Sequence, residues 1–231
     1  MPRDWSALYA LQDEVLALLA PIDQGFYLTG GTALGRGYFE HRYSEDLDFF
    51  VNDDAHFELW RDRCVETLRR AAGRAGQRFE ILLREPRLGR AVWHGPEPLK
   101  LEFINDVPCR IGQPWTHPAL GRLDTKENIL ANKVSALVDR KAPKDLADVY
   151  WLCCRDHLDV LAAIEGAEGK AAGIFPPLVA RTLEETLCNG VPEVFWIKTP
   201  EPDEFRRGIQ GLIQKIMDGT NPDHSPADRR G

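Results

Sequence analysis

The stretch FYLTGGTALGRGYFEHRYSEDLDFFV, residues 26–51, contains the features that decide the fold. Its first four residues, 26–29, predict a short buried strand that runs directly into a glycine turn at 30–32, where we expect a helix to begin. The segment DLDFFV at 46–51 alternates in polarity, which predicts a second strand. This order places two acidic residues close to a glycine-rich turn.

Asp46 and Asp48 are two residues apart on the second predicted strand, so their side chains should emerge on one face while Leu47 and Phe49 point into the core. Two neighbouring carboxylates repel each other unless a cation lies between them, and such hard oxygen ligands suit Mg²⁺ or Mn²⁺. The alternative is ordinary solvent exposure at a strand end, because Asp-x-Asp is a common pattern.

Gly30, Gly31 and Thr32 form the turn upstream of these acids. Glycines allow backbone N–H groups to approach a ligand closely, and the start of a helix favours negative charge, so phosphate could bind here. Thr32 adds a hydroxyl group. A tight turn between a strand and a helix, with no ligand, is the other interpretation.

A third carboxylate would complete a two-metal site for in-line displacement. Glu102 is the best candidate, because the segment LKLEFI should place Lys100, Glu102 and Ile104 on the face opposite the apolar residues. Asp106 lies on the same face and is the rival. Without a ligand role, Lys100 and Glu102 would be surface charges on an edge strand.

Lys133 is predicted to emerge within the apolar stripe of a helix, and a lysine in that position needs a phosphate or a carboxylate partner. Lys126 shares this side but can reach solvent. On the next helix Asp145 lies beside the apolar stripe, and Asp148 is expected to turn further away. Asp145 could accept a proton as a general base, or it could form a structural salt bridge to Lys133.

Outside this central stretch, the hydrophobic pattern predicts an N-terminal half with a sheet and a C-terminal half of helices. The predicted helices are 4–20, 55–75, 126–140, 143–154, 156–165, 175–188 and 203–218. Three strand-like segments that should form a meander are FEILLRE (79–85), RAVWH (90–94) and PLKLEFINDV (98–107). We expect no strand after them.

The expected fold class is therefore α+β, a mixed sheet with flanking helices followed by a C-terminal helical bundle. The expected domains are residues 1–112 and 123–218, because Gly and Pro residues cluster between them. Residues 219–231 lack large apolar side chains and are predicted to be a disordered tail.

Composition supports a globular protein. The chain has 231 residues, 43% hydrophobic content and five cysteines without zinc or disulfide spacing, so we expect reduced thiols and a cytoplasmic location. No apolar run approaches the length needed to span a bilayer. The formal charge of -7 argues against general electrostatic binding of nucleic acid, although arginines are concentrated in residues 61–90, either as a solvated surface or as a local basic patch.

The segment LTGGTALGRGYFEHRYSEDLDFF, residues 28–50, closely resembles the signature of the AbiEii/AbiGii toxin family, a branch of the nucleotidyltransferase superfamily related to DNA polymerase beta. LANKVSALVDR (130–140) and KDLADVYWL (144–152) resemble the downstream motifs of that family. The resemblance covers residues 28–50 and 125–152. It implies a nucleotidyltransferase-like fold and metal-dependent transfer of a nucleotidyl group from a nucleoside triphosphate.

The resemblance also implies residue roles. Asp46, Asp48 and Glu102 would bind Mg²⁺ or Mn²⁺, and Asp145, in the Lys-Asp motif formed by Lys144 and Asp145, would be the base for the acceptor. The residues that would bind the nucleotide are Gly30, Gly31, Thr32, Ser44 and Lys133. Two departures from the family pattern are Gly-Gly-Thr in place of Gly-Ser and Glu102 in place of the commoner Asp.

Similar proteins act as toxins in toxin–antitoxin or phage-defence pairs, and some modify the acceptor end of tRNA, so the expected partners are a nucleoside triphosphate, a tRNA acceptor and a cognate antitoxin. A second hypothesis keeps the chemistry but replaces the acceptor with a small cationic molecule such as an aminoglycoside, which an acidic cleft would suit. A third is a catalytically silent module that binds nucleotides or a partner.

Overall fold

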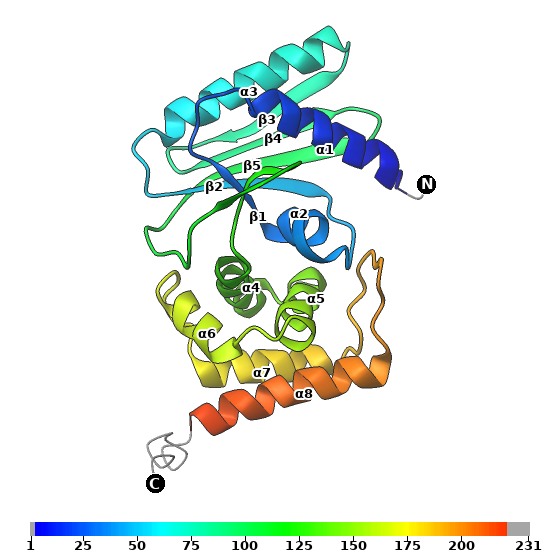
Figure 1. Ribbon diagram of the computed structural model, residues 1–231, viewed down its shortest axis with the longest axis vertical. Helices are drawn as coiled ribbons and strands as arrows, with labels where there is room; N and C mark the ends of the chain where they lie inside the picture. The colour runs from blue at the N-terminus through cyan, green and yellow to red at the C-terminus, as the bar shows by residue number, and fades with distance from the viewer. Residues whose placement is uncertain (1–2, 221–231) are drawn as a thin grey trace. The chain divides into compact units, whose positions relative to one another are not determined.

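The computed structural model describes residues 3–220, so most of the predicted tail, residues 221–231, lies outside the described part of the chain (Figure 1). The chain divides into two compact units. The first unit extends to Pro108 and includes Gln113–Thr125, whereas the second contains Cys109–Gly112 and the chain from Lys126 onward.

The first unit is built on a seven-stranded sheet. Its strands are β1 (Tyr27–Thr29), β2 (Asp46–Asn52), β3 (Arg78–Arg84), β4 (Leu88–His94), β5 (Pro98–Asp106), β6 (Trp115–His117) and β7 (Gly121–Leu123), in the order β3-β4-β5-β2-β1-β7-β6. Strands β3, β4 and β5 form the predicted antiparallel meander. Strand β5 then pairs in parallel with β2, and β1 pairs in parallel with β7, which makes the sheet mixed.

Strands β6 and β7 correct the expectation that no strand follows residue 107. Each has only three residues, and WTH and GRL carry no apolar alternation that could indicate a strand. Long-range pairing creates them: Leu123 of β7 is in register with Leu28 of β1, and β6 folds back onto β7 as a hairpin. Tertiary context therefore overrides a weak local pattern here.

Helices cover one face of this sheet. Helix α1 (Trp5–Leu19) begins at Asp4, whose side chain accepts a hydrogen bond from the Ala7 backbone, and helix α3 (Phe57–Arg74) follows β2. Figure 1 shows both helices beside each other near β3, β4 and β5, and α1 contacts α3 and β5 while α3 contacts β3 and β4. Beneath them, the stacked rings of Phe49 and Phe103, 5.3 Å apart between centroids, form part of the core.

A short helix, α2 (Gly30–Leu34), begins directly after β1 and continues as a π-helical turn, η1 (Gly35–Phe39). This confirms the order strand, glycine turn, helix start and strand that the sequence indicates for residues 26–51.

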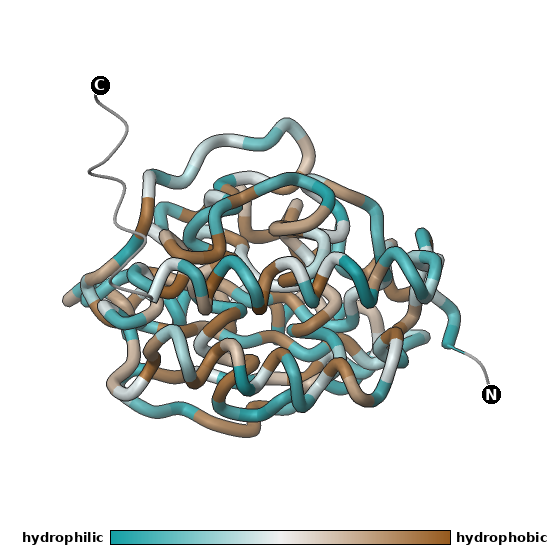
Figure 2. Tube along the Cα trace, turned by 90° about the horizontal axis from the view of Figure 1, so that it is seen from below, coloured by the Kyte–Doolittle hydropathy of each residue, from teal (hydrophilic) through white to brown (hydrophobic). Residues whose placement is uncertain are grey.

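The second unit is helical in its described residues. Its helices are α4 (Lys126–Arg140), α5 (Pro143–Tyr150), the π-helical turn η2 (Trp151–Arg155), α6 (Val160–Glu168), α7 (Pro176–Leu187) and α8 (Pro202–Gly219). Helix α6 begins four residues later than expected, because Asp159 caps it by accepting a hydrogen bond from the Leu161 backbone. Figure 2 shows hydrophobic and hydrophilic residues alternating along the helices, as amphipathic packing requires.

The α+β fold with a helical C-terminal part is thus confirmed. No helix among residues 3–220 is long and apolar enough to cross a membrane.

Candidate functional site

Asp46 and Asp48 lie on the sheet face opposite the one covered by α1 and α3. Along β2 the burial alternates, so Leu47 and Phe49 are buried in the core while both acids are partly exposed. Asp48 is in register with Thr29 on one side and Glu102 on the other. The predicted alternation therefore places the two acids together on one face, and the parallel pairing of β2 with β5 adds Glu102 to that face.

The two glycines of the turn make room for specific polar groups. Gly30 has φ +70°, a conformation that favours glycine, and a Cβ atom there would lie 2.4 Å from Oδ2 of Asp48. A Cβ atom on Gly31 would lie 2.6 Å from Nη2 of Arg42 and 2.8 Å from Oγ of Ser44. The turn is therefore packed against Asp48 on one side and against Arg42 and Ser44 on the other.

Thr32 is fully buried, and its hydroxyl donates a hydrogen bond to the backbone carbonyl of Asp46. The sequence places this hydroxyl at the nucleotide, but in the structure its proton is already donated within the protein. Thr32 thus ties the first turn of α2 to the first residue of β2. This contact holds the backbone of a predicted metal ligand in place.

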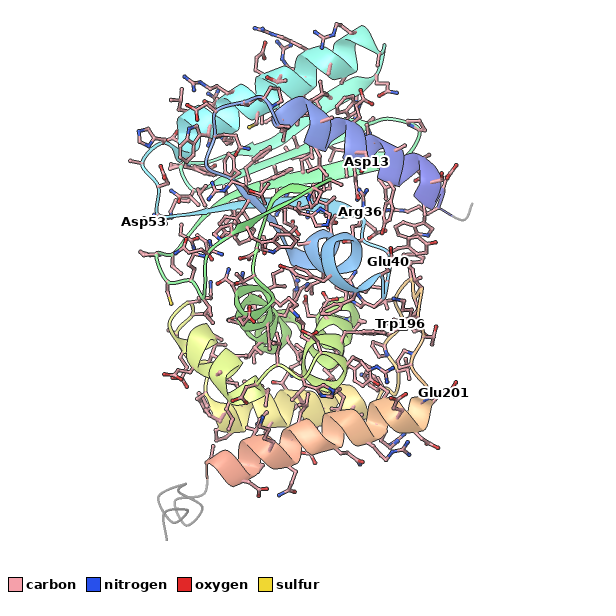
Figure 3. All side chains as sticks on the ribbon, in the orientation of Figure 1. Asp13, Arg36, Glu40, Asp53, Trp196 and Glu201 are labelled. Carbon is pink, nitrogen blue, oxygen red and sulfur yellow. The ribbon has the colours of Figure 1, made fainter. Side chains whose placement is uncertain are left out.

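Ser44 is buried in the loop before β2, and helix α1 supports that loop. The Ser44 backbone N–H donates to the Tyr9 hydroxyl at 3.2 Å, and its carbonyl accepts from Gln12 Nε2 at 3.0 Å. Arg36 on η1 donates to Gln12 at 3.1 Å and forms an ion pair with Asp13 (Figure 3). Helix α1 and the π-helical turn together fix the loop that leads into the acids.

Arg42 is a residue that the sequence did not single out. It is 4% exposed, its Nη1 donates to the Tyr43 carbonyl at 3.0 Å, and it packs against Gly31. The Tyr43 ring in turn stacks on Trp5 of α1, with 4.5 Å between centroids. Arg42 could have been noticed in the sequence, because it lies two residues before Ser44 in the segment FEHRYSEDLD. An arginine in a predicted loop is usually exposed, however, so the local sequence gave no reason to expect its burial.

Glu102 lies on the predicted face of the sheet, but its carboxylate forms ion pairs with two basic side chains. Oε1 of Glu102 accepts from Arg90 Nε at 2.6 Å and lies 3.0 Å from Lys100 Nζ. Burial opposes the charged form, but Lys100 and Arg90 outweigh it, so the pKa of Glu102 is lowered. The rival Asp106 lies further along the face, in register with Asn52.

Within residues 3–220, no three His, Cys, Asp or Glu side chains come together in an arrangement that could hold a metal ion. For Asp46, Asp48 and Glu102 the backbone register favours such a group, but the contacts of Glu102 with Arg90 and Lys100 direct its carboxylate to cations. Asp46 and Asp48 are the hard oxygen donors of the type that Mg²⁺ or Mn²⁺ prefers.

A second residue that sequence reasoning missed is Asp124, which is fully buried after β7. Its Oδ2 accepts from the Thr29 hydroxyl at 2.7 Å, and its carbonyl accepts from the Tyr38 hydroxyl at 2.6 Å. Thr29 is the register partner of Asp48. Asp124 therefore braces β1, η1 and β7 next to the strand that carries the acids.

The second unit contains the predicted lysine and the aspartates of α5. Lys133 Nζ lies 2.9 Å from Oδ1 of Asp145 and 2.7 Å from Oδ2 of Asp148, and both aspartates are fully buried. The expectation that Asp148 turns away is therefore wrong. Residues three apart share a helix face, so Asp145 and Asp148 both point towards α4.

Arg140 is a further partner of Asp145, with its Nε 2.7 Å from Oδ2. Burial raises the pKa of Asp145, but the Coulombic effect of Lys133 and the contacts with Arg140 outweigh it, so the net pKa is lowered. A carboxylate with a lowered pKa is a weak proton acceptor. Of the two interpretations left open by the sequence, these contacts favour the salt bridge.

Other charged residues from the sequence are also paired. Lys126 donates to Asp156 at 2.6 Å within the second unit. Most of the arginines between 61 and 90 contact acids of the first unit: Arg61 with Asp62, Arg69 and Arg70 with Glu66, Arg78 with Glu80, Arg84 with Asp62, Arg87 with Asp53 and Arg90 with Glu102. A surface of mutually paired charges describes this segment better than an unbroken basic patch.

Comparison with solved structures places this fold among nucleotidyltransferases. JHP933 from Helicobacter pylori is 18% identical, with a TM-score of 0.61 over 95% of this chain and 94% of that one. The MenT4 nucleotidyltransferase toxin of Mycobacterium tuberculosis is 17% identical, with a TM-score of 0.59 over 95% and 86%. The antibiotic-resistance factor ANT(2'')-Ia is 14% identical, with a TM-score of 0.51 over 72% and 92%. No curated protein compared with the chain matches it.

The sequence profile of the family described as "Nucleotidyl transferase AbiEii toxin, Type IV TA system" matches residues 15–218, which include the glycine turn, the Asp-x-Asp strand and the Lys133 helix. Both the resemblance seen in the motifs and the fold agree with this match. The chain belongs to the AbiEii family of nucleotidyltransferase toxins.

Proposed function

We propose that this protein transfers a nucleotidyl group from a nucleoside triphosphate to an RNA acceptor, with Mg²⁺ or Mn²⁺ bound at Asp46 and Asp48. The observation that carries the proposal is the bare backbone of Gly30 against the Asp48 carboxylate, on the same sheet face as Asp46. This arrangement brings a glycine backbone, which can approach a phosphate closely, next to two hard oxygen ligands.

The carboxylate oxygens of Asp46 and Asp48 are donors of the type that a divalent cation prefers. Asp46 and Asp48 project from one face of β2, and the absence of a Cβ atom on Gly30 lets the Asp48 carboxylate lie directly against the glycine backbone. When bound, the metal would neutralise charge on the transferring phosphoryl group and on the leaving pyrophosphate. Glu102 would join this ligand set only after leaving Arg90 and Lys100.

For the nucleotide, we propose that the backbone of Gly30 and Gly31 approaches the triphosphate. Arg42 and Ser44 pack against this turn and would hold its shape. Thr32 would act through Asp46, because its hydroxyl already donates to the Asp46 carbonyl. In each of these roles a backbone group or side chain is already in position before the substrate binds. Less entropy is therefore lost when the substrate and the protein reach the reactive geometry.

In the second unit, we propose that Lys133 and Asp145 act first as an ion pair that fixes α4 to α5. Contact of Lys133 with phosphate and proton acceptance by Asp145 are the roles that the resemblance implies. Either would require a change in the contacts that Lys133 makes with Asp145 and Asp148. A variant of Lys133 or Asp145 that still folds but no longer transfers the nucleotidyl group would support those roles.

An RNA acceptor such as tRNA, and an antitoxin partner, are proposed from membership of a toxin family of type IV toxin–antitoxin systems. Because most arginines between 61 and 90 are paired with acids, we expect them to contribute only modestly to the electrostatic part of RNA affinity. That affinity should therefore fall less steeply with salt concentration than the affinity of a strongly basic surface. A small-molecule acceptor and a silent binding module are the competing outcomes.

The test is incubation of the protein with each radiolabelled nucleoside triphosphate, Mg²⁺ and either total cellular RNA or lysate. Label in RNA supports the proposal, and label in small solutes points to the small-molecule alternative. Absence of transfer with every triphosphate, together with nucleotide binding, indicates the silent module. The variants Asp46→Asn and Asp48→Asn should lose transfer, whereas the neighbouring Glu45→Gln, which removes a surface ion pair with Arg3, should retain it.

A further inference from the structure

Five charged side chains occupy neighbouring positions on the face of β4, β5 and β2 that carries Asp46 and Asp48. Across the strands, Arg90 is in register with Glu102, and Glu102 with Asp48. One step along, Lys100 is in register with Asp46. Neighbouring strands lie about 4.8 Å apart, so charges on residues in register are close enough to influence one another electrostatically. This part of the face therefore carries two cations and three acids, and Glu102 has a cation, Arg90, on one side and an acid, Asp48, on the other.

Glu102 is the shared member of this group. Its Oε1 accepts from Arg90 Nε at 2.6 Å and lies 3.0 Å from Lys100 Nζ. The side chain of Glu102 is 15% exposed, whereas those of Arg90 and Lys100 are 39% and 37% exposed. The two cations can therefore reach solvent from positions in which they hold a more buried carboxylate.

In this arrangement, two different binding events would each require the same ion pairs to break. A metal ion at Asp46 and Asp48 would gain a third oxygen ligand only if Glu102 leaves Arg90 and Lys100. An anion would bind Arg90 and Lys100 strongly only if the same ion pairs are released. Binding of either ligand thus breaks the ion pairs that hinder binding of the other ligand. By thermodynamic linkage, each ligand must then raise the affinity for the other by the same factor.

We propose that Arg90 and Lys100 form a phosphate-binding pair whose occupation releases Glu102 to the metal site, so that metal and phosphate bind with positive cooperativity. The inference rests on the proposed metal-dependent function and adds a regulation of that site. Arginine offers a planar donor pair that matches phosphate, and lysine adds a compact charge beside it. The phosphate could belong to the nucleotide or to the acceptor.

The first measurement is Mn²⁺ affinity, determined by electron paramagnetic resonance in sulfate and in chloride at equal ionic strength. Sulfate serves as the phosphate mimic. The wild-type protein should bind Mn²⁺ about fivefold or more tightly in sulfate. Glu102→Gln should bind Mn²⁺ with one affinity in both salts, because the carboxylate that couples the two sites is absent.

The double variant Arg90→Gln/Lys100→Gln should also show no sulfate effect, but its Mn²⁺ affinity in chloride should exceed that of the wild type, because Glu102 is already released. Arg84→Gln is the matched control, since Arg84 lies at the end of β3 and pairs with Asp62. It should keep the wild-type sulfate effect. If the double variant unfolds more easily, the increase in its melting temperature on adding Mn²⁺ should exceed the wild-type increase.

Equal Mn²⁺ affinity in sulfate and chloride for the wild-type protein overturns the inference, and so does a sulfate effect that survives in Glu102→Gln. These results differ from failure of the proposed function, in which Asp46→Asn and Asp48→Asn would leave Mn²⁺ binding unchanged. A non-hydrolysable triphosphate analogue then identifies the phosphate. Weaker binding of the analogue by the double variant assigns the pair to the nucleotide, and unchanged binding assigns it to the acceptor.

Discussion

Gly30 lies directly against Asp48: a Cβ atom on Gly30 would be 2.4 Å from Oδ2 of that carboxylate. The glycine also has φ +70°, so two independent constraints act at one position. The backbone of the glycine turn is therefore packed directly against a predicted metal ligand.

Gly30→Ala should therefore reduce both stability and transfer. The left-handed backbone costs a residue with a Cβ atom about 1–3 kcal/mol, and the added methyl group must displace the Asp48 carboxylate. Urea unfolding and Mn²⁺ affinity are the measurements. Gly73→Ala, within helix α3 and with nothing within 4 Å of the new Cβ atom, is the control and should leave Mn²⁺ affinity unchanged.

Thr32→Val should weaken the connection between α2 and β2. The variant keeps the shape of the side chain but removes the donor to the Asp46 carbonyl, which should cost about 1–3 kcal/mol for a buried acceptor. Thr32→Ser retains the hydroxyl and should recover most of the stability in thermal unfolding. Equal unfolding free energies for Val and wild type would exclude a role for this hydrogen bond.

Lys133→Met should destabilise the second unit strongly. It leaves Asp145 and Asp148 buried without their shared cation, and breaking a buried pair in this way costs about 3–5 kcal/mol. Chemical denaturation measures the loss. Lys215→Met, which removes a half-exposed contact with Asp159, should change stability by no more than about 1 kcal/mol.

Adding Asp145→Asn and Asp148→Asn to Lys133→Met should restore part of the lost stability, because the uncompensated charges are then removed. If the triple variant is less stable than Lys133→Met by the sum of the separate aspartate effects, the three side chains do not act as one ion-pair group.

Stability should fall at acid pH because of Asp145. Its folded-state pKa is lowered by Lys133 and Arg140 despite burial, so its contribution is fully present above the unfolded-state pKa of about 3.9. That contribution is lost as pH falls through the lower folded-state pKa. Asp145→Asn should flatten this acid dependence in unfolding measured between pH 7 and pH 2.

Local patterns predicted the parts of this protein that depend on neighbouring residues. The alternation of DLDFFV put Asp46 and Asp48 on one face because the strand period is two, and the amphipathic stripe of α4 placed Lys133 where it needs a partner. The motifs of residues 28–50 also indicated the family that the profile match confirms.

Other features depended on pairing between distant segments. Strands β6 and β7 exist because β7 pairs with β1, and Asp148 faces Lys133 because α5 packs on α4. The choice of partner for Glu102 was equally invisible, since Arg90 reaches it from the adjacent strand β4.

The sequence by itself determined the order of strands and helices around the glycine turn, and the chemical types of side chain available at the site. Only the tertiary structure decided which acidic and basic side chains form ion pairs. A carboxylate pairs with the cation that packing brings within about 3 Å. That distance depends on strand register and on helix packing between residues far apart in the chain.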